Sequence, residues 1–350
     1  LSSFDKSRPE SGDLQLVTGG VGAGKSLFAR RYKEYLQPPA LAERNHWSFL
    51  DFNNAPNGFE GIENWICQSF VESLLEEGAP IDISNADDQE RVFSSMIAAR
   101  QSYYDRMEAV QERRGLLEKA RDIEEWRQNW EVLAEGVARY LQGDRGENIV
   151  VVFDNVDRRD VETQLSAFQA ALWFMARTRA LIILQMRDET FEAYKDQPPL
   201  DTYKTGQIFH ISPPRFVDVV KRRLELSLEA LSELAPETIH YSTPSGVKIS
   251  YPQSRAGDFL TTIYRDVFER RSNVSKIMEA LAGRNVRRAL DMFMAVLTSG
   301  HMPEDLITSV ARGDSKRSFP EHRVLKILMR QDYKYFNDNA GFISNIFYCD

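Results

Sequence analysis

The sequence predicts an α/β protein built around a parallel β-sheet, and three observations support that prediction. Short apolar runs alternate along the first 212 residues with segments of helical periodicity. The run 148–153, NIVVVF, is continuously apolar, which is typical of a strand buried on both faces. A glycine-rich segment, 19–26, joins a predicted strand to a predicted helix. Because strands separated by helices need crossover connections, the strands are expected to run parallel.

The first 212 residues contain all the strands of the predicted sheet. Five segments have the length and composition of strands: 13–18, 47–52, 148–153, 180–185 and 207–212. A helix is predicted directly after the glycine-rich segment, and two more over 61–77 and 161–178, where apolar residues recur on one face. We therefore predict a core domain over residues 1–212.

A long charged segment, 87–142, separates the second predicted strand from the third. Apolar residues recur in it every three or four positions, it contains no proline, and its one interior break is at Gly115. We predict two or three antiparallel helices, part of a helical insertion over about 60–145. Core or coiled-coil packing explains its apolar residues, and a partner-binding surface is the alternative.

After residue 212 the predicted elements become mainly helical. Helices are predicted over 215–233, 257–282 and 284–298. Alternating residues around the turn TPSG predict a β-hairpin near 238–251. We predict a helical lid over 213–312, followed over 313–350 by the start of a winged-helix-like segment.

The composition excludes several classes of protein. A formal net charge of −8 argues against a protein that coats nucleic acid over its whole surface. No run approaches the roughly 18 apolar residues of a membrane span. The two cysteines, Cys67 and Cys349, provide neither a disulfide scaffold nor metal-ligand spacing, so we expect a cytoplasmic protein. The five histidines fit no zinc-binding pattern.

The segment 19–26, GGVGAGKS, fits the pattern G-x-x-x-x-G-K-[ST] of a phosphate-binding loop. Glycines let successive backbone N–H groups approach a phosphate, and the helix that follows directs the positive end of its dipole at the same group. We predict that Lys25 contacts the β- and γ-phosphates and that Ser26 binds Mg²⁺. The predicted nucleotide-binding residues are Gly19, Gly20, Val21, Gly22, Ala23, Gly24, Lys25, Ser26 and Leu27.

A carboxylate that holds the metal is expected at the end of a nearby strand. Asp154 follows the buried run 148–153 and is, with Ser26, the predicted metal ligand. Asn155 stands directly after it, where many ATPases have an acid, and an amide cannot act as a base. Asp157 is the candidate to orient the attacking water, or else a structural partner of one of the two arginines that follow it.

The strand 180–185 is expected to lie beside the strand that ends at Asp154. Gln185 and Arg187 stand at its end, at the sheet edge where open α/β sheets bind ligands. Either side chain could contact the γ-phosphate. A solvent-exposed arginine without such a role is the alternative.

Together these motifs resemble the additional-strand P-loop ATPases over about residues 13–300. The most similar groups are the AAA+ proteins of origin-recognition kind, the STAND NTPases and the KAP-type NTPases, whose acidic run is similar to DNVDR. In AAA+ proteins a lid arginine reaches the γ-phosphate, and the segment GRNVRRAL implies Arg287 for this role. Arg288 stays open because the spacing from Gly283 is one residue longer than in the family.

A basic patch lies at 312–334, with seven basic residues and three acidic ones. Such a patch can neutralise the phosphates of nucleic acid. A solvated face or a protein interface is the alternative. Arg177 and Arg179 are the candidates for an arginine that acts on the nucleotide of a neighbouring subunit, or else they complement the carbonyl end of their helix.

The sequence therefore predicts an ATPase that binds ATP or ADP with Mg²⁺ and acts as a nucleotide-driven conformational or oligomerisation switch. The predicted catalytic residues are Lys25, Asp154, Asp157, Arg187 and Arg287. No GTP-specific NKxD motif follows the loop, which favours ATP. We expect a homo-oligomer or a partner protein bound through the insertion, and no membrane.

Family analogy points to a bacterial phage-defence or mobile-element system. Two other functions stay open. Asn155 favours a nucleotide-stabilised scaffold with little hydrolysis. The basic patch favours a DNA-loading or remodelling ATPase.

Overall fold

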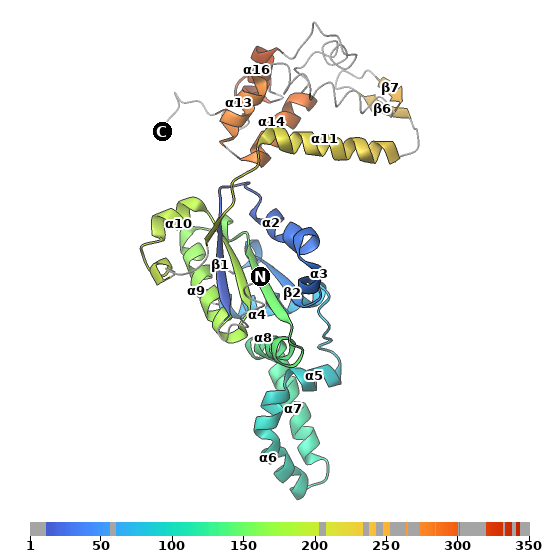
Figure 1. The fold of residues 1–350 in the computed structure, drawn as a ribbon, viewed down its shortest axis with the longest axis vertical. Helices are drawn as coiled ribbons and strands as arrows, with labels where there is room; N and C mark the ends of the chain where they lie inside the picture. The colour runs from blue at the N-terminus through green and yellow to red at the C-terminus, as the bar shows by residue number, and fades with distance from the viewer. Residues whose placement is uncertain are drawn as a thin grey trace. The chain divides into compact units, whose positions relative to one another are not determined.

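The computed structural model describes residues 12–56, 61–202, 208–233, 238–242, 248–252, 264, 273–283, 285–299, 301, 320–331, 333–337 and 341–343. These residues fall into two compact units (Figure 1). The first comprises the described residues up to Gly19 and those of Gly24–Ile211. The second comprises Gly20–Ala23 and the described residues from Ser212 onward.

A five-stranded parallel sheet forms the centre of the first unit and confirms the predicted fold class. Its strands are β1 (Asp13–Thr18), β2 (Asn45–Asp51), β3 (Asn148–Asp154), β4 (Leu181–Met186) and β5 (Ile208–His210). They lie in the order β2-β3-β4-β1-β5, so one additional strand, β4, separates β1 from β3. The expected pairing of β4 with β3 is confirmed.

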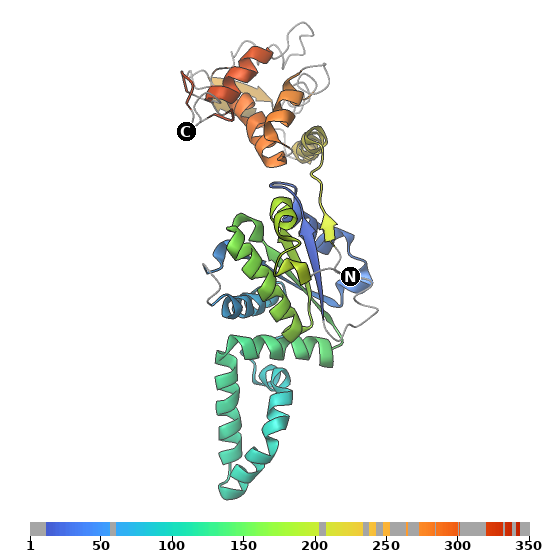
Figure 2. The same cartoon turned by 90° about the vertical axis from the view of Figure 1, so that its left-hand side faces the viewer.

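Helices cover both faces of this sheet (Figure 2). On one face lies α2 (Lys25–Arg31), with Ala29 packed against Trp47 and Val152. On the other face lie α4 (Ile62–Glu76) and α9 (Val161–Thr178). The helices after the glycine-rich segment and over 61–77 and 161–178 are thus confirmed, because their apolar faces have buried strands to cover.

The shorter elements of the first unit complete its loops. They are η1 (Tyr32–Leu36, a π-helix), α3 (Pro39–Ala42), η2 (Phe52–Asn54), η3 (Tyr140–Asp144, a π-helix), η4 (Val156–Arg158), α10 (Asp188–Tyr194) and η5 (Leu200–Thr202). The sequence did not predict α10. No described helix is long and apolar enough to cross a membrane.

The charged segment 87–142 forms four helices rather than two or three. They are α5 (Ala86–Val92), α6 (Ser94–Val110), α7 (Arg114–Gln128) and α8 (Trp130–Arg139). α6 and α7 form an antiparallel hairpin, while α8 packs on α4 and α9 (Figure 2). The chain reverses at Arg113, whose φ is 65°, and not at Gly115. Gly115 instead lets the two helices approach, because a Cβ there would lie 2.5 Å from the Tyr104 carbonyl oxygen.

The second unit contains α11 (Phe216–Glu233), β6 (Thr238–Ser242), β7 (Lys248–Pro252), α13 (Val274–Ala282), α14 (Val286–Thr298) and α16 (Glu321–Arg330). The antiparallel pairing of β6 with β7 confirms the predicted hairpin, whose turn lies outside the described residues. Phe216, Met278, Met292 and Ile327 pack in one core. The predicted helix 257–282 and the winged-helix-like segment 313–350 lie partly outside the described residues. The domain limits stay predictions.

Candidate functional site

The glycine-rich loop connects β1 to α2, as predicted. Gly22 and Gly24 have positive φ angles of 75° and 94°, a backbone conformation that residues with a Cβ rarely adopt. Gly24 is the N-cap of α2, which begins at Lys25 without a side-chain cap. The first turn of this helix therefore presents backbone N–H groups, and it contains no acidic residue that would repel an anion.

The Lys25 side chain is buried, with 5% of its surface exposed. Its Nζ donates a hydrogen bond to the carbonyl oxygen of Gly19 at 2.7 Å and lies 2.9 Å from Oδ2 of Asp157. A buried ammonium needs such partners, because losing its hydration is costly. The predicted residues Lys25 and Asp157 are thus in direct contact, although they are far apart in the sequence.

Ser26 and Asp154 also meet. The Ser26 hydroxyl donates to Oδ1 of Asp154 at 2.5 Å, and the same oxygen accepts the backbone N–H of Asn155 at 2.8 Å. A hydroxyl and a carboxylate side by side are hard oxygen donors of the kind that Mg²⁺ prefers. The two predicted metal ligands therefore fit a magnesium ion.

Gln185, at the end of β4, lies beside this pair. Its Oε1 is 3.4 Å from the Ser26 Oγ, and its side chain is almost fully buried. Among the described residues, its Nε2 has no hydrogen-bond partner. A buried amide nitrogen without a partner is costly, so a water or ligand is expected there.

Arg187 follows two residues after Gln185, directly after β4, and occupies the N-cap position of α10. Its Nε is buried without a hydrogen-bond partner in the part of the chain that the structure describes. Of the two candidates at this end of the sheet, Gln185 contacts Ser26, and no such contact is made by Arg187 among the described residues. The acidic pair Asp188 and Glu189 is a signal from which α10 could have been predicted, because acidic residues suit the first turn of a helix.

Asp157 does not pair with either following arginine, which was one of its two predicted roles. Its partner is Lys25. Asn155 adopts a left-handed conformation with φ 60°, and its Nδ2 donates to Oδ1 of Asp51 at 2.8 Å. Sequence reasoning missed Asp51. The available signal was its position as the last residue of a strand, at the same sheet edge as Asp154.

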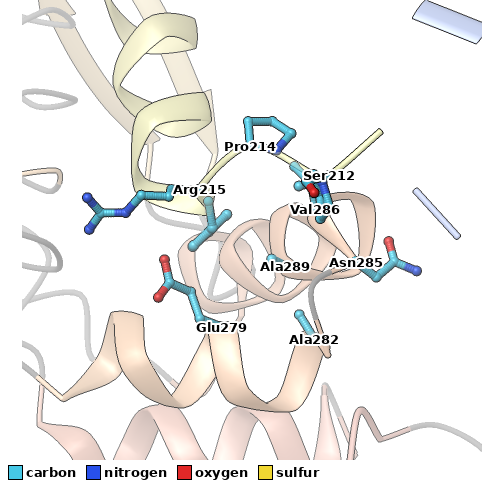
Figure 3. A pocket seen from close by; sticks show the side chains of 10 residues that line it. Ser212, Pro214, Arg215, Glu279, Ala282, Asn285, Val286 and Ala289 are labelled. Carbon is cyan, nitrogen blue, oxygen red and sulfur yellow. The ribbon is translucent and has the colours of Figure 1, made fainter. Parts of the chain in front are cut away.

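Arg287 and Arg288, the two predicted lid arginines, are both exposed in the first turn of α14. Arg288 donates from its guanidinium to the carbonyl oxygen of Phe342 at 2.7 Å. The occupied guanidinium of Arg288 favours Arg287 as the arginine available to a ligand. The second unit also contains a cavity of about 310 Å³, lined among others by Arg215, Glu279 and Asn285 (Figure 3).

Arg177 and Arg179, the candidates for an arginine that acts on a neighbouring subunit, lie away from Lys25 and Ser26 within the first unit. Arg177 pairs with Glu135 of α8 at 2.7 Å, and Arg179 ends α9 in a left-handed conformation. Since β3 ends where α9 begins, α9 ends at the opposite edge of the sheet from the loop. Of the basic patch at 312–334, Arg312, Lys316 and Arg317 lie outside the described residues, while Arg323, Lys326 and Arg330 belong to α16.

No family model and no curated protein matches the sequence. The solved structures that match include the Aeropyrum pernix ORC2 protein in its ADP form, with 13% identity over 90% of this chain and 62% of that chain, at a TM-score of 0.39. Another is Drosophila ORC bound to DNA, with 12% identity over 93% of this chain and 64% of that chain, at a TM-score of 0.38. A third is Cdc6p from Pyrobaculum aerophilum, with 13% identity over 82% of this chain and 59% of that chain, at a TM-score of 0.35.

This chain therefore spans less than two thirds of the length of these structures. At such identities and scores the similarity says nothing about activity. The fold itself is defined by the chain's own elements: a parallel α/β sheet with a glycine-rich loop after β1 and an acid at the end of β3. That arrangement is the P-loop NTPase fold class.

Proposed function

We propose that this chain binds Mg²⁺–ATP and hydrolyses it, as a nucleotide-driven conformational or oligomerisation switch. One observation carries the proposal: Lys25 contacts Asp157 of η4, and Ser26 contacts Asp154 at the end of β3, both across the intervening strand β4. A phosphate loop requires a cation for the phosphates and a hydroxyl–carboxylate pair for the metal. The chain brings both together at one sheet edge.

Each residue then has a distinct role. Lys25 exchanges Asp157 for the phosphate oxygens of ATP, and the loop N–H groups bind the same phosphates. Ser26 and Asp154 hold Mg²⁺, which when bound neutralises charge on the phosphates. Asp157 and Arg187 are the candidates for orienting water and contacting the γ-phosphate, and Arg287 is the candidate lid arginine.

The test is ATP binding measured by calorimetry with and without Mg²⁺. Lys25→Ala should weaken ATP binding at least about 30-fold, because it removes a charge-assisted contact worth about 2–3 kcal/mol. Lys195→Ala is the matched control, since that lysine is exposed and paired with Glu192 of its own helix. Equal ATP affinity in wild type and Lys25→Ala would refute the assignment.

Two alternatives have observations in their favour. Asn155 supports a nucleotide-stabilised scaffold with little hydrolysis, and steady-state phosphate release separates it from an ATPase. The basic residues of α16 support a DNA-loading or remodelling ATPase, with the 312–334 patch as its contact. Salt-dependent DNA binding, and turnover with and without DNA, test that alternative. The phage-defence context and the STAND and KAP-type affinities rest on resemblance alone.

A further inference from the structure

Hydrolysis needs a group that positions the attacking water and accepts its proton. The residue after Asp154 is Asn155, whose amide cannot accept that proton. Asp157 has a carboxylate that pairs with Lys25 in this structure and that would be released if ATP took its place on Lys25. Asp51 provides a second carboxylate at the same edge of the sheet, and among the described residues it is paired with no cation.

Asp51 is placed there by strand register. It is the last residue of β2 and pairs directly with Asp154 of β3. Because side chains alternate along a strand, Asp51 lies on the same face of β2 as Trp47. Asp154 likewise lies on the same face of β3 as Val152. Trp47 and Val152 pack on Ala29 of α2. Asp51 and Asp154 therefore continue rows that face α2, the helix that carries Ser26.

Asp51 is also held in place by hydrogen bonds. Its Oδ1 accepts the Asn155 side-chain amide at 2.8 Å and the Asn53 backbone N–H at 3.1 Å. Among the described residues no donor is bonded to its Oδ2. The residue is exposed, so its carboxylate is hydrated and accessible to water.

Asn155 suits the role of positioning this carboxylate. Its left-handed backbone, at φ 60°, is one that asparagine tolerates better than most residues. This conformation turns the side chain from β3 toward the end of β2. The carboxylate thus stands at the end of β2, and the amide directly after the neighbouring strand β3.

We propose that Asp51 is the general base for ATP hydrolysis and that Asn155 positions it; this rests on the proposed function. The water oxygen forms a bond to the γ-phosphorus while the bond to the β–γ bridging oxygen breaks, and ADP leaves with that electron pair. The water proton passes to the Asp51 carboxylate and then to solvent. The unpartnered Nε2 of Gln185, buried beside Ser26, is an independent sign that a ligand or water belongs at this edge.

The test compares three variants by ATP affinity and steady-state turnover. Asp51→Asn should lower turnover about 100-fold or more, the usual effect of losing a general base, with ATP affinity within about threefold of wild type. The exchange variant Asp51→Asn with Asn155→Asp restores one carboxylate and one amide in swapped positions. It should recover at least about tenfold over Asp51→Asn. Asp105→Asn, an exposed acid on α6, is the matched control.

Thermal unfolding keeps the test independent of folding. The amide oxygen introduced by Asp51→Asn can still accept from Asn155, so this variant should unfold at the wild-type temperature while its turnover falls. Losing a purely structural Asp51 would lower both. The inference is overturned if Asp51→Asn turns over like wild type, if the exchange variant recovers nothing, or if Asp157→Asn alone abolishes turnover. Wild type that binds ATP without hydrolysing it would overturn this inference and favour the scaffold. Wild type that binds no ATP would overturn the proposed function itself.

Discussion

Two carboxylates of the first unit, the buried Asp122 and the partly buried Asp157, are each stabilised by a cation but differ in where that cation lies. Asp122, in the α6–α7 hairpin, accepts a hydrogen bond from the Tyr104 hydroxyl at 2.6 Å and lies 3.1 Å from Arg100. Asp157, beside the glycine-rich loop, pairs with Lys25. Both avoid the cost of a lone buried charge.

The difference lies in the partner. Both partners of Asp122 belong to α6, so the contact can serve only to hold α6 against α7. The partner of Asp157 belongs to the loop proposed to bind phosphate, so an incoming anion competes for it. A buried ion pair is thus no sign of function by itself. Its meaning depends on whether the partner has another ligand to bind.

The largest effect is expected when the contacts of Asp122 in the α6–α7 hairpin are removed. Asp122→Ala should lower the free energy of unfolding by about 3 kcal/mol, because it leaves the buried Tyr104 hydroxyl without an acceptor and Arg100 without its counter-ion. Hydrogen exchange should quicken in α6 and α7 and not in the sheet, while ATP affinity stays unchanged. Asp105→Ala, an exposed acid of α6, is the control. Unaltered exchange in the hairpin would show that the contact does not hold it.

The second prediction tests the exchangeable pair. Asp157→Asn should cost only about 1 kcal/mol, because an amide oxygen can still accept from Lys25 and the Gly19 carbonyl remains. ATP should bind as tightly or up to about tenfold more tightly, since Lys25 no longer has a charged competitor. Thermal unfolding with and without Mg²⁺–ATP measures both effects. Weaker ATP binding would mean that Asp157 itself supports the nucleotide.

Sequence reasoning predicted the elements that burial dictates. β3 and β4 are apolar because both faces of the sheet are covered, so their limits could be inferred from composition alone. The loop, Lys25, Ser26 and Asp154 were predictable because phosphate chemistry demands those residues at that spacing.

What sequence reasoning missed depends on contacts between distant residues. Gly115 looks like a helix break, but it serves the close approach of α6 and α7, and Arg113 makes the turn. The Asn155–Asp51 hydrogen bond joins residues 104 positions apart, so it follows from strand register and not from either motif. The Lys25–Asp157 pair has the same origin.

The third prediction concerns the hairpin again, where a single hydrogen bond is removed and ATP binding is unaffected. Tyr104→Phe should lower the free energy of unfolding at neutral pH by about 1 kcal/mol, the usual net value of one hydrogen bond. Asp122 keeps Arg100, so this loss is smaller than that of Asp122→Ala. Burial, with the hydrogen bond to Asp122, raises the pKa of Tyr104 to about 12 from an ordinary value of 10.0.

That shift predicts a pH dependence with a definite sign. The folded state holds the phenol proton more tightly than the unfolded chain, so Tyr104 stabilises the fold fully below pH 10. As pH rises from about 10 to 12, the unfolded chain loses this proton first, and the stabilisation is lost. The difference in stability between wild type and Tyr104→Phe should therefore shrink over that range, because the variant lacks the titrating group. Denaturant unfolding at matched pH values measures it. A difference in stability that stays constant from pH 8 to 12 would mean that the folded state holds the Tyr104 proton no more tightly than the unfolded chain does. The hydrogen bond to Asp122 would then not stabilise the hairpin in the way proposed.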